Sequence, residues 1–247
     1  MARVDVFDDA GVLLDAAADA VVAIAAGSIA ARGRMTIALS GGATPRGLYQ
    51  RLAGAWRDRI DWSRVHVFWG DERCVPATHA DSNYRLAREA LLDHVPVPAT
   101  QIHRMPGEVE PVAAARQYAA TLEAALGDAT SGQRVVLDLV LLGLGADGHT
   151  ASLFPGGAAV DETQRTVVAT PPAEGRGWRL TLTLPVLNAA RSTLWLVAGE
   201  SKAPALAAVL EHLPAPVGLP AQRVTGHDVR WMVDRAAARL LTGASRP

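Results

Sequence analysis

The residues best suited to chemistry lie in one glycine-rich loop. Residues 137–142, apolar except for Asp138, form a run typical of a buried strand, and Gly143-Leu144-Gly145 ends it, with Asp147 and His149 directly downstream. Open α/β sheets bind ligands in the loops at the carboxyl ends of their strands. Histidine is also the side chain that most readily exchanges protons near neutral pH. The pattern predicts a catalytic His149 with Asp147 beside it.

A second loop of the same construction is SGGATP, residues 40–45, which follows a short apolar run. Gly41 and Gly42 let the backbone approach a ligand closely, and the helix that follows presents unpaired N–H groups and a positive dipole. Ser40 and Thr44 add hydroxyl groups. These features suit a phosphate, although an ordinary strand–helix turn capped by Thr44 would have the same sequence.

Two more loops bring charged or polar side chains to the ends of strand-like runs. Asp71 and Arg73 follow one run, with Asn83 and Arg85 a little further on. Lys202 opens a helical pattern, where the helix dipole opposes a cation unless an anion is bound. Each has a plainer interpretation as a surface ion network, a helix cap or a solvated side chain. Four such loops after four strands predict one crevice along the carboxyl edge of a sheet.

Helical and strand-like segments alternate between these loops. Helices are predicted over residues 8–31, 44–55, 82–94, 111–126, 202–212 and 234–241, and strands over residues 35–39, 65–69, 137–142, 167–169, 180–184, 193–197 and 230–233. This alternation predicts an α/β fold, a doubly wound, mostly parallel sheet with helices on both faces. Because no connecting loop is long enough for an interdomain linker, we expect a single domain over residues 1–247.

Composition narrows the class of protein. The net charge is −1 and no basic stripe is present, so we expect no nucleic-acid partner. The single cysteine, Cys74, excludes an internal disulfide and suits a reducing cytoplasm. Asp15 and Asp19 interrupt the alanine-rich N-terminal segment, which argues against a membrane span. His149 and Asp147 lack a third ligand at metal spacing, so no metal site is expected.

Four blocks of the sequence resemble the 6-phosphogluconolactonase family. They are SGGATP (40–45), FWGDERCVP followed by DSNYR (68–85), LGLGADGHTASLFPG (142–156), and RLTLTLPVLN followed by AGESKA (179–203). The resemblance implies the Rossmann-like sheet of the glucosamine-6-phosphate deaminase and ribose-5-phosphate isomerase folds. It further implies a cytoplasmic, cofactor-free, monomeric enzyme of the oxidative pentose phosphate pathway. The substrate would be a sugar-phosphate lactone, 6-phospho-D-glucono-1,5-lactone, hydrolysed to 6-phospho-D-gluconate.

The resemblance also implies roles for individual residues. His149 would be the general base that activates a water molecule against the lactone carbonyl, assisted by Asp147 or Asp71. The oxyanion donors would be backbone amides of the glycine loops or Arg73. The residues expected to bind the substrate, mainly its phosphate, are Ser40, Gly41, Gly42, Thr44, Arg73, Asn83, Arg85, Arg179 and Lys202.

Two other functions share part of this pattern. Glucosamine-6-phosphate deaminases resemble this chain, but their corresponding block reads like DGHIAFNEP, with a catalytic glutamate before the proline. Phe154 occupies that position here, which weakens the deaminase interpretation. A non-catalytic sugar-phosphate sensor would use the phosphate loop and Lys202 equally well. A sensor usually needs an output module, and the sequence contains no helix-turn-helix or second domain.

Overall fold

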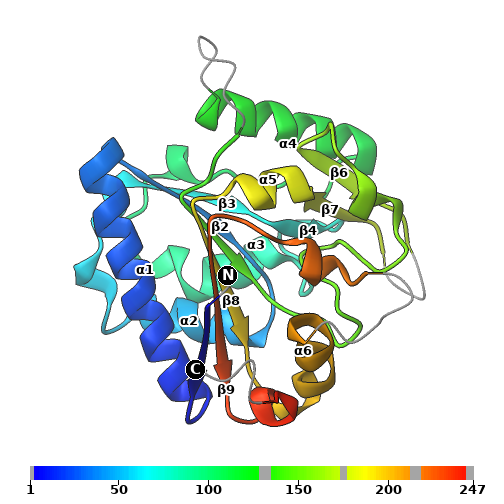
Figure 1. Ribbon diagram of the computed structural model, residues 1–247. Helices are drawn as coiled ribbons and strands as arrows, with labels where there is room; N and C mark the ends of the chain where they lie inside the picture. The colour runs from blue at the N-terminus through cyan, green and yellow to red at the C-terminus, as the bar shows by residue number, and fades with distance from the viewer. Residues whose placement is uncertain (1–2, 128–134, 173–176, 212–217, 243–247) are drawn as a thin grey trace.

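A six-stranded parallel sheet forms the centre of the molecule, and a small antiparallel sheet lies beside it (Figure 1). The computed structural model describes residues 3–127, 135–172, 177–211 and 218–242. The main sheet has the order β1-β9-β8-β5-β2-β3, with β1 Arg3–Phe7, β2 Met35–Leu39, β3 Val65–Trp69, β5 Leu139–Leu142, β8 Ser192–Val197 and β9 Asp228–Asp234. The small sheet has the order β4-β7-β6, with β4 Asp71–Arg73, β7 Arg179–Leu182 and β6 Val167–Thr170.

Six α-helices surround the sheets in the described part of the chain. They are α1 Ala10–Arg32, α2 Ala43–Ala53, α3 Asn83–Ala90, α4 Pro111–Leu126, α5 Leu184–Ala189 and α6 Ala203–Leu210. Helix α1 packs against α2 and β9, whereas α4 packs against β6 and β7 of the small sheet. Figure 1 shows α1 on one side and α6 on the other side of strands β8 and β9. The predicted doubly wound, mostly parallel α/β fold is confirmed.

The strand order creates a crevice between β2 and β5. Strand β2 pairs with β3 on one side and with β5 on the other, so the chain changes direction across the sheet at this point. Both strands are buried along their whole length, as expected of central parallel strands. The loops that leave their carboxyl ends diverge, and such a switch point is where open α/β sheets bind ligands.

Helix α1 is long and apolar enough to cross a membrane, by length and composition alone, and a buried core helix can have the same length and composition. Its residues Leu13 and Val21 are buried in the hydrophobic core. On its exposed side Asp19 accepts hydrogen bonds from the Trp56 indole and the Arg59 guanidinium. Helix α1 thus contacts the core with one face and the segment around Trp56 and Arg59 with the other, as a helix packed within this fold does.

Several elements differ from the sequence prediction. Strand β4 was missed because three charged residues have low strand propensity, and its antiparallel pairing with β7 forms it. The edge strand β1 and the short helix α5 were also missed. The strand predicted to reach Leu184 stops earlier, since Leu184 begins α5 with Pro185 in its first turn.

Three predicted helices are clearly shorter in the structure. The helix predicted over residues 82–94 ends at Ala90 as α3, and a 3₁₀ turn, Leu92–His94, follows it. The closing helix over residues 234–241 is a 3₁₀ turn at Ala237–Leu240, because β9 continues through Asp234. The helix predicted over residues 202–212 begins as a 3₁₀ turn, Glu200–Lys202, followed by α6, and residue 212 lies outside the described residues.

A buried carboxylate at the amino end of β5 stabilises the sheet edge opposite the crevice. Asp138 is 4% exposed and accepts hydrogen bonds from the Thr36 amide at 2.8 Å and the Arg32 guanidinium at 2.9 Å. We expect Asp138→Ala to lower the free energy of unfolding by about 3 kcal/mol, because it leaves the buried Thr36 amide and the Arg32 guanidinium without their acceptor. Urea denaturation measures this loss.

The matched control is Asp58→Ala. The Asp58 side chain is 93% exposed, and its ion pair with Arg57 is long, at 3.6 Å. Its removal should therefore change the free energy of unfolding by less than about 0.5 kcal/mol. Equal losses for the two variants would contradict the structural role of Asp138.

Candidate active site

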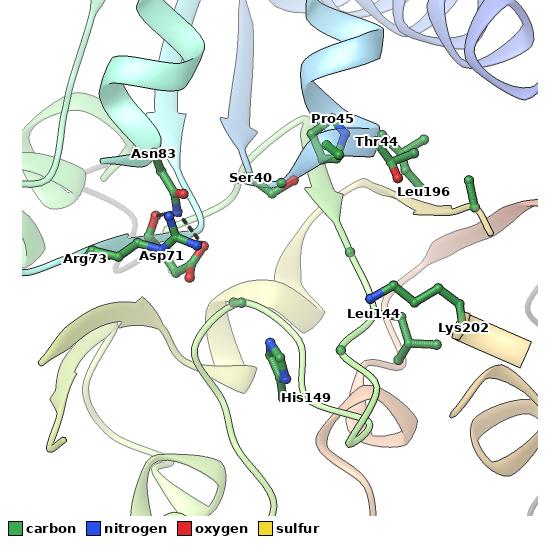
Figure 2. Close-up of a pocket in the computed structure, with 17 residues that line it drawn as sticks. Ser40, Thr44, Pro45, Asp71, Arg73, Asn83, Leu144, His149, Leu196 and Lys202 are labelled. Carbon is green, nitrogen blue, oxygen red and sulfur yellow. Dashed lines mark hydrogen bonds between the residues drawn. The ribbon is translucent and has the colours of Figure 1, made fainter. Parts of the chain in front are cut away.

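Loops from the carboxyl edge of the main sheet and from the small sheet enclose one cavity of about 370 Å³. Figure 2 shows His149 lying between Asp71 on one side and Lys202 on the other, with Ser40 and Thr44 across the cavity. The lining residues are Ser40, Gly41, Gly42, Ala43, Thr44, Pro45, Asp71, Arg73, Asn83, Gly143, Leu144, Gly145, His149, Ala151, Leu196, Ala198 and Lys202. The predicted crevice therefore brings together residues from all four loops singled out in the sequence.

His149 is held by Asp147. The Asp147 carboxylate accepts a hydrogen bond from His149 Nδ1 and a second, at 3.2 Å, from the His149 backbone amide. Partial burial raises the pKa of Asp147, but the hydrogen bonds from His149 outweigh burial and bring that pKa below its ordinary value. An ionised carboxylate at Nδ1 keeps the imidazole proton on that nitrogen, which leaves Nε2 free to accept a proton.

The position of the His149 imidazole depends on glycine at position 145. A Cβ atom there would lie 1.9 Å from His149 Nδ1 and 2.6 Å from the Asp147 carboxylate. The Gly145 amide donates to the carbonyl oxygen of His149 at 2.9 Å, which closes the turn. Gly145 thus allows the imidazole to fold back against its own loop.

The loop after β2 presents backbone amides to the cavity. Gly42 is the N-cap of α2, and no side chain caps this helix, so the interpretation of Thr44 as a simple cap is wrong. The Tyr49 hydroxyl anchors the loop, accepting from the Ser40 amide at 2.9 Å and donating to the Ser40 carbonyl at 2.7 Å. Within the described residues the Ser40 hydroxyl has no hydrogen-bond partner, although it is buried. The α2 N-terminus and Ser40 therefore retain donors that an anion can use.

Asp71 and Asn83 form a bonded pair on the opposite wall. Asn83 Nδ2 donates to the Asp71 backbone carbonyl at 2.9 Å and to Asp71 Oδ1 at 3.2 Å. The Asn83 amide lies so close to the glycine loop that a Cβ at Gly41 would be 1.8 Å from its Oδ1. Arg73 follows on β4 and donates to the backbone carbonyl of Asp81. Strand β4 and the start of α3 thus place a carboxylate, a guanidinium and an amide beside the glycine loop.

Glu72, next to Asp71, has a structural function. Its buried carboxylate accepts the amides of Asn83 and Tyr84, each at 2.7 Å, and the Ser82 hydroxyl at 3.1 Å. Burial raises the pKa of Glu72, and the amide donors partly offset that rise. Glu72 therefore fixes the start of α3, and it is not among the residues that line the cavity.

Three predicted site residues do not line the cavity. Asp147 reaches it only through His149. Arg85 donates to Glu89 at 2.6 Å and to the carbonyl of Thr78 at 3.0 Å. Arg179 begins β7, where it pairs with Arg73 of β4. Among the described residues, no group of three His, Cys, Asp or Glu side chains is arranged to hold a metal ion.

Other features of the site escaped the sequence prediction. The apolar lining residues Leu144, Leu196 and Ala198 follow no chemical motif. Ser152, whose hydroxyl contacts Asp71, was also missed. Lys202, in contrast, was among the predicted site residues, and it is the only lysine among the 24 lysines and arginines of the chain.

Comparison with known proteins assigns the family. The family described as glucosamine-6-phosphate isomerases/6-phosphogluconolactonase matches residues 8–233. The chain belongs to this family. It is 41% identical over 241 residues to the 6-phosphogluconolactonase of Synechocystis sp., covering 97% of this chain and 98% of that protein. It is 38% identical over 251 residues to the 6-phosphogluconolactonase of Mycobacterium tuberculosis, with 96% and 98% covered.

Solved structures of the family have the same architecture. The 6-phosphogluconolactonase from Trypanosoma cruzi superposes with a TM-score of 0.84 at 31% identity, covering 98% of this chain and 97% of that one. A monomeric glucosamine-6-phosphate deaminase superposes with a TM-score of 0.79 at 22% identity, covering 97% and 100%, so the likeness to it is one of fold. The family predicted from the four sequence blocks is confirmed.

Phe154 lies against the ring of His149. Its ring lies 4.7 Å from the His149 ring, centroid to centroid, with a 44° angle between the planes. By the sequence resemblance, deaminases place their catalytic glutamate at this position. The Phe154 ring has no group that could take or give a proton at this position.

Proposed function

We propose that this chain hydrolyses 6-phospho-D-glucono-1,5-lactone to 6-phospho-D-gluconate in the oxidative pentose phosphate pathway. The observation that carries the proposal is one cavity with the His149–Asp147 pair on one loop and anion-binding groups on two others. Relatives named 6-phosphogluconolactonase match the chain over nearly their whole length, which supports the same reaction. We further propose that residues 1–247 act as one cytoplasmic, monomeric domain.

The proposed chemistry is attack of water on an ester. His149 Nε2 takes a proton from water while the water oxygen bonds to the lactone carbonyl carbon, and this general-base step contributes about 10²–10⁴-fold. The tetrahedral intermediate then expels the ring oxygen, which receives the same proton from the imidazolium. Asp147 stabilises the imidazolium through Nδ1, and Asp71 is the second carboxylate able to assist. No cofactor enters this balance.

The phosphate of the substrate is proposed to bind at the start of α2. The amides of the glycine loop, the hydroxyls of Ser40 and Thr44, and the Lys202 ammonium supply its donors. Asn83 would contact a sugar hydroxyl, and Arg73 or the glycine-loop amides would stabilise the oxyanion. Arg85 and Arg179 do not line the cavity, so these two arginines are not among the proposed phosphate donors. A phosphate held away from the carbonyl orients the lactone, and orientation is converted into rate.

The decisive experiment measures turnover of freshly generated 6-phosphogluconolactone by the wild-type protein. A slightly acidic buffer keeps spontaneous hydrolysis slow, and unphosphorylated gluconolactone and glucosamine-6-phosphate serve as comparison substrates. We expect fast hydrolysis of the phosphorylated lactone and no comparable turnover of either comparison substrate. Background rates with the phosphorylated lactone would overturn the proposal, and ammonia release from glucosamine-6-phosphate would indicate a deaminase.

A further inference from the structure

A buried serine connects the two walls of the cavity. Ser152 Oγ donates to Asp71 Oδ2 at 2.7 Å, and the two residues are 2% and 8% exposed. Ser152 belongs to the segment that follows His149, whereas Asp71 lies on β4 of the small sheet. One hydrogen bond therefore joins the loop of the proposed base to the strand that carries Asp71 and Arg73.

This hydrogen bond completes the orientation of the Asp71 carboxylate. Its other oxygen, Oδ1, accepts from Asn83 Nδ2 at 3.2 Å. Figure 2 shows the Asn83 amide against Asp71 at the cavity wall. With one donor on each oxygen, rotation of the carboxylate would break at least one buried hydrogen bond, and each such loss is costly. Ser152 and Asn83 together hold Asp71 in a single orientation where it meets the cavity.

The backbone around Ser152 is arranged to make this contact. The Ser152 amide donates to Thr181 Oγ1 at 3.2 Å, and Thr181 is the residue on β7 paired with Asp71. The preceding residue, Ala151, has φ of +47°, a left-handed conformation that costs an alanine about 1–2 kcal/mol. Strain of this kind persists where surrounding contacts enforce it, often at functional sites. Ala151 lines the cavity while Ser152 turns behind it to Asp71.

We propose that Ser152 is a positioning residue for the reaction: it sets the Asp71 carboxylate relative to His149, and Asp71 in turn contacts the reacting end of the substrate. The inference rests on the proposed lactonase function. Ser152 itself acts through Asp71 and touches no substrate. Misplacement of a reacting group by about 1 Å can cost about 10²-fold in rate, so the effect belongs in kcat rather than in binding of the distant phosphate.

A double-mutant cycle tests this directly. Steady-state kinetics with the phosphorylated lactone would compare wild type, Ser152→Ala, Asp71→Asn and the double variant. We expect Ser152→Ala to lower kcat by about 10- to 100-fold with little change in KM. In the Asp71→Asn background the same substitution should cost little more, because the group that Ser152 positions is already altered. Ser152→Thr, which keeps the hydroxyl, should recover part of kcat.

Thr183→Val is the matched control, since Thr183 is fully buried and its hydroxyl donates to the Arg165 carbonyl at 2.6 Å, outside the cavity. It should lose stability without losing kcat. The inference would be overturned if the Ser152→Ala and Asp71→Asn losses of kcat simply multiplied in the double variant. It would also be overturned if Ser152→Ala, like Thr183→Val, lost stability without losing kcat. If Ser152→Ala does not fold, Ser152→Cys takes its place in the cycle. Absence of turnover in the wild type would instead refute the proposed function, and the inference with it.

Discussion

Replacing His149 with alanine is expected to lower kcat for the phosphorylated lactone by about 10²–10⁴-fold, the usual contribution of a general base. The imidazole is the proposed proton acceptor, because its Nδ1 is held by the Asp147 carboxylate and its ring lines the cavity. Binding of the product, 6-phosphogluconate, should change little, because the proposed phosphate donors lie on other loops. Stopped assays give kcat, and isothermal titration gives product affinity.

Two further variants separate catalysis from general damage. Asp147→Asn keeps the shape of the loop but removes the charge that stabilises the imidazolium, so we expect a smaller loss of kcat than for His149→Ala. His227→Ala removes an exposed histidine at the amino end of β9, away from the cavity, and should leave kcat unchanged. Product affinity falling in step with kcat in His149→Ala would mean that His149 binds substrate rather than accepts a proton.

The central elements of the fold were predictable because burial leaves a clear sequence pattern. Strands β2, β3 and β5 are mostly apolar runs, interrupted only by Thr36 and His66, since strands of a parallel sheet with helices on both faces are largely buried. Strand β4 carries no such pattern, because its charged residues are held by pairing with β7. Contacts between segments distant in the chain decide such elements, and local propensity does not report them.

The residues of the site could be predicted where the loop sequence itself decides the geometry. They could not be predicted where the direction of a side chain decides whether it reaches the cavity. Gly41 and Gly145 are required locally, because a Cβ at either position would collide with a site residue. Arg85 instead turns to Glu89 on its own helix, an i,i+4 pairing that its sequence position allowed equally well. The contact of Ser152 with Asp71 spans 81 residues, so only the folded structure reveals it.

Lys202→Ala is expected to raise KM for the phosphorylated lactone by about 10- to 100-fold, the value of a hydrogen bond to a charged group. Among the described residues, the Lys202 ammonium has no ion-pair or hydrogen-bond partner, and Lys202 lines the cavity. Slow hydrolysis of unphosphorylated gluconolactone should not change. Lys202→Arg keeps the charge but replaces a compact ammonium with a planar guanidinium, so we expect an intermediate KM. Equal losses for both lactones in Lys202→Ala would contradict a phosphate contact.

The composition of the chain offers an independent test of the same contact. Because Lys202 is the only lysine, an amine-selective reagent can modify only its ammonium and the amino terminus. Reductive methylation followed by peptide mass analysis reports the two positions separately. We expect 6-phosphogluconate to slow methylation of Lys202 while the amino terminus reacts at its usual rate, and unphosphorylated gluconate to protect neither. Protection of Lys202 by gluconate as well would place the ammonium at the sugar rather than at the phosphate. If neither ligand protected Lys202, the ammonium would not contact the bound ligand, and a change of KM in Lys202→Ala would need another explanation.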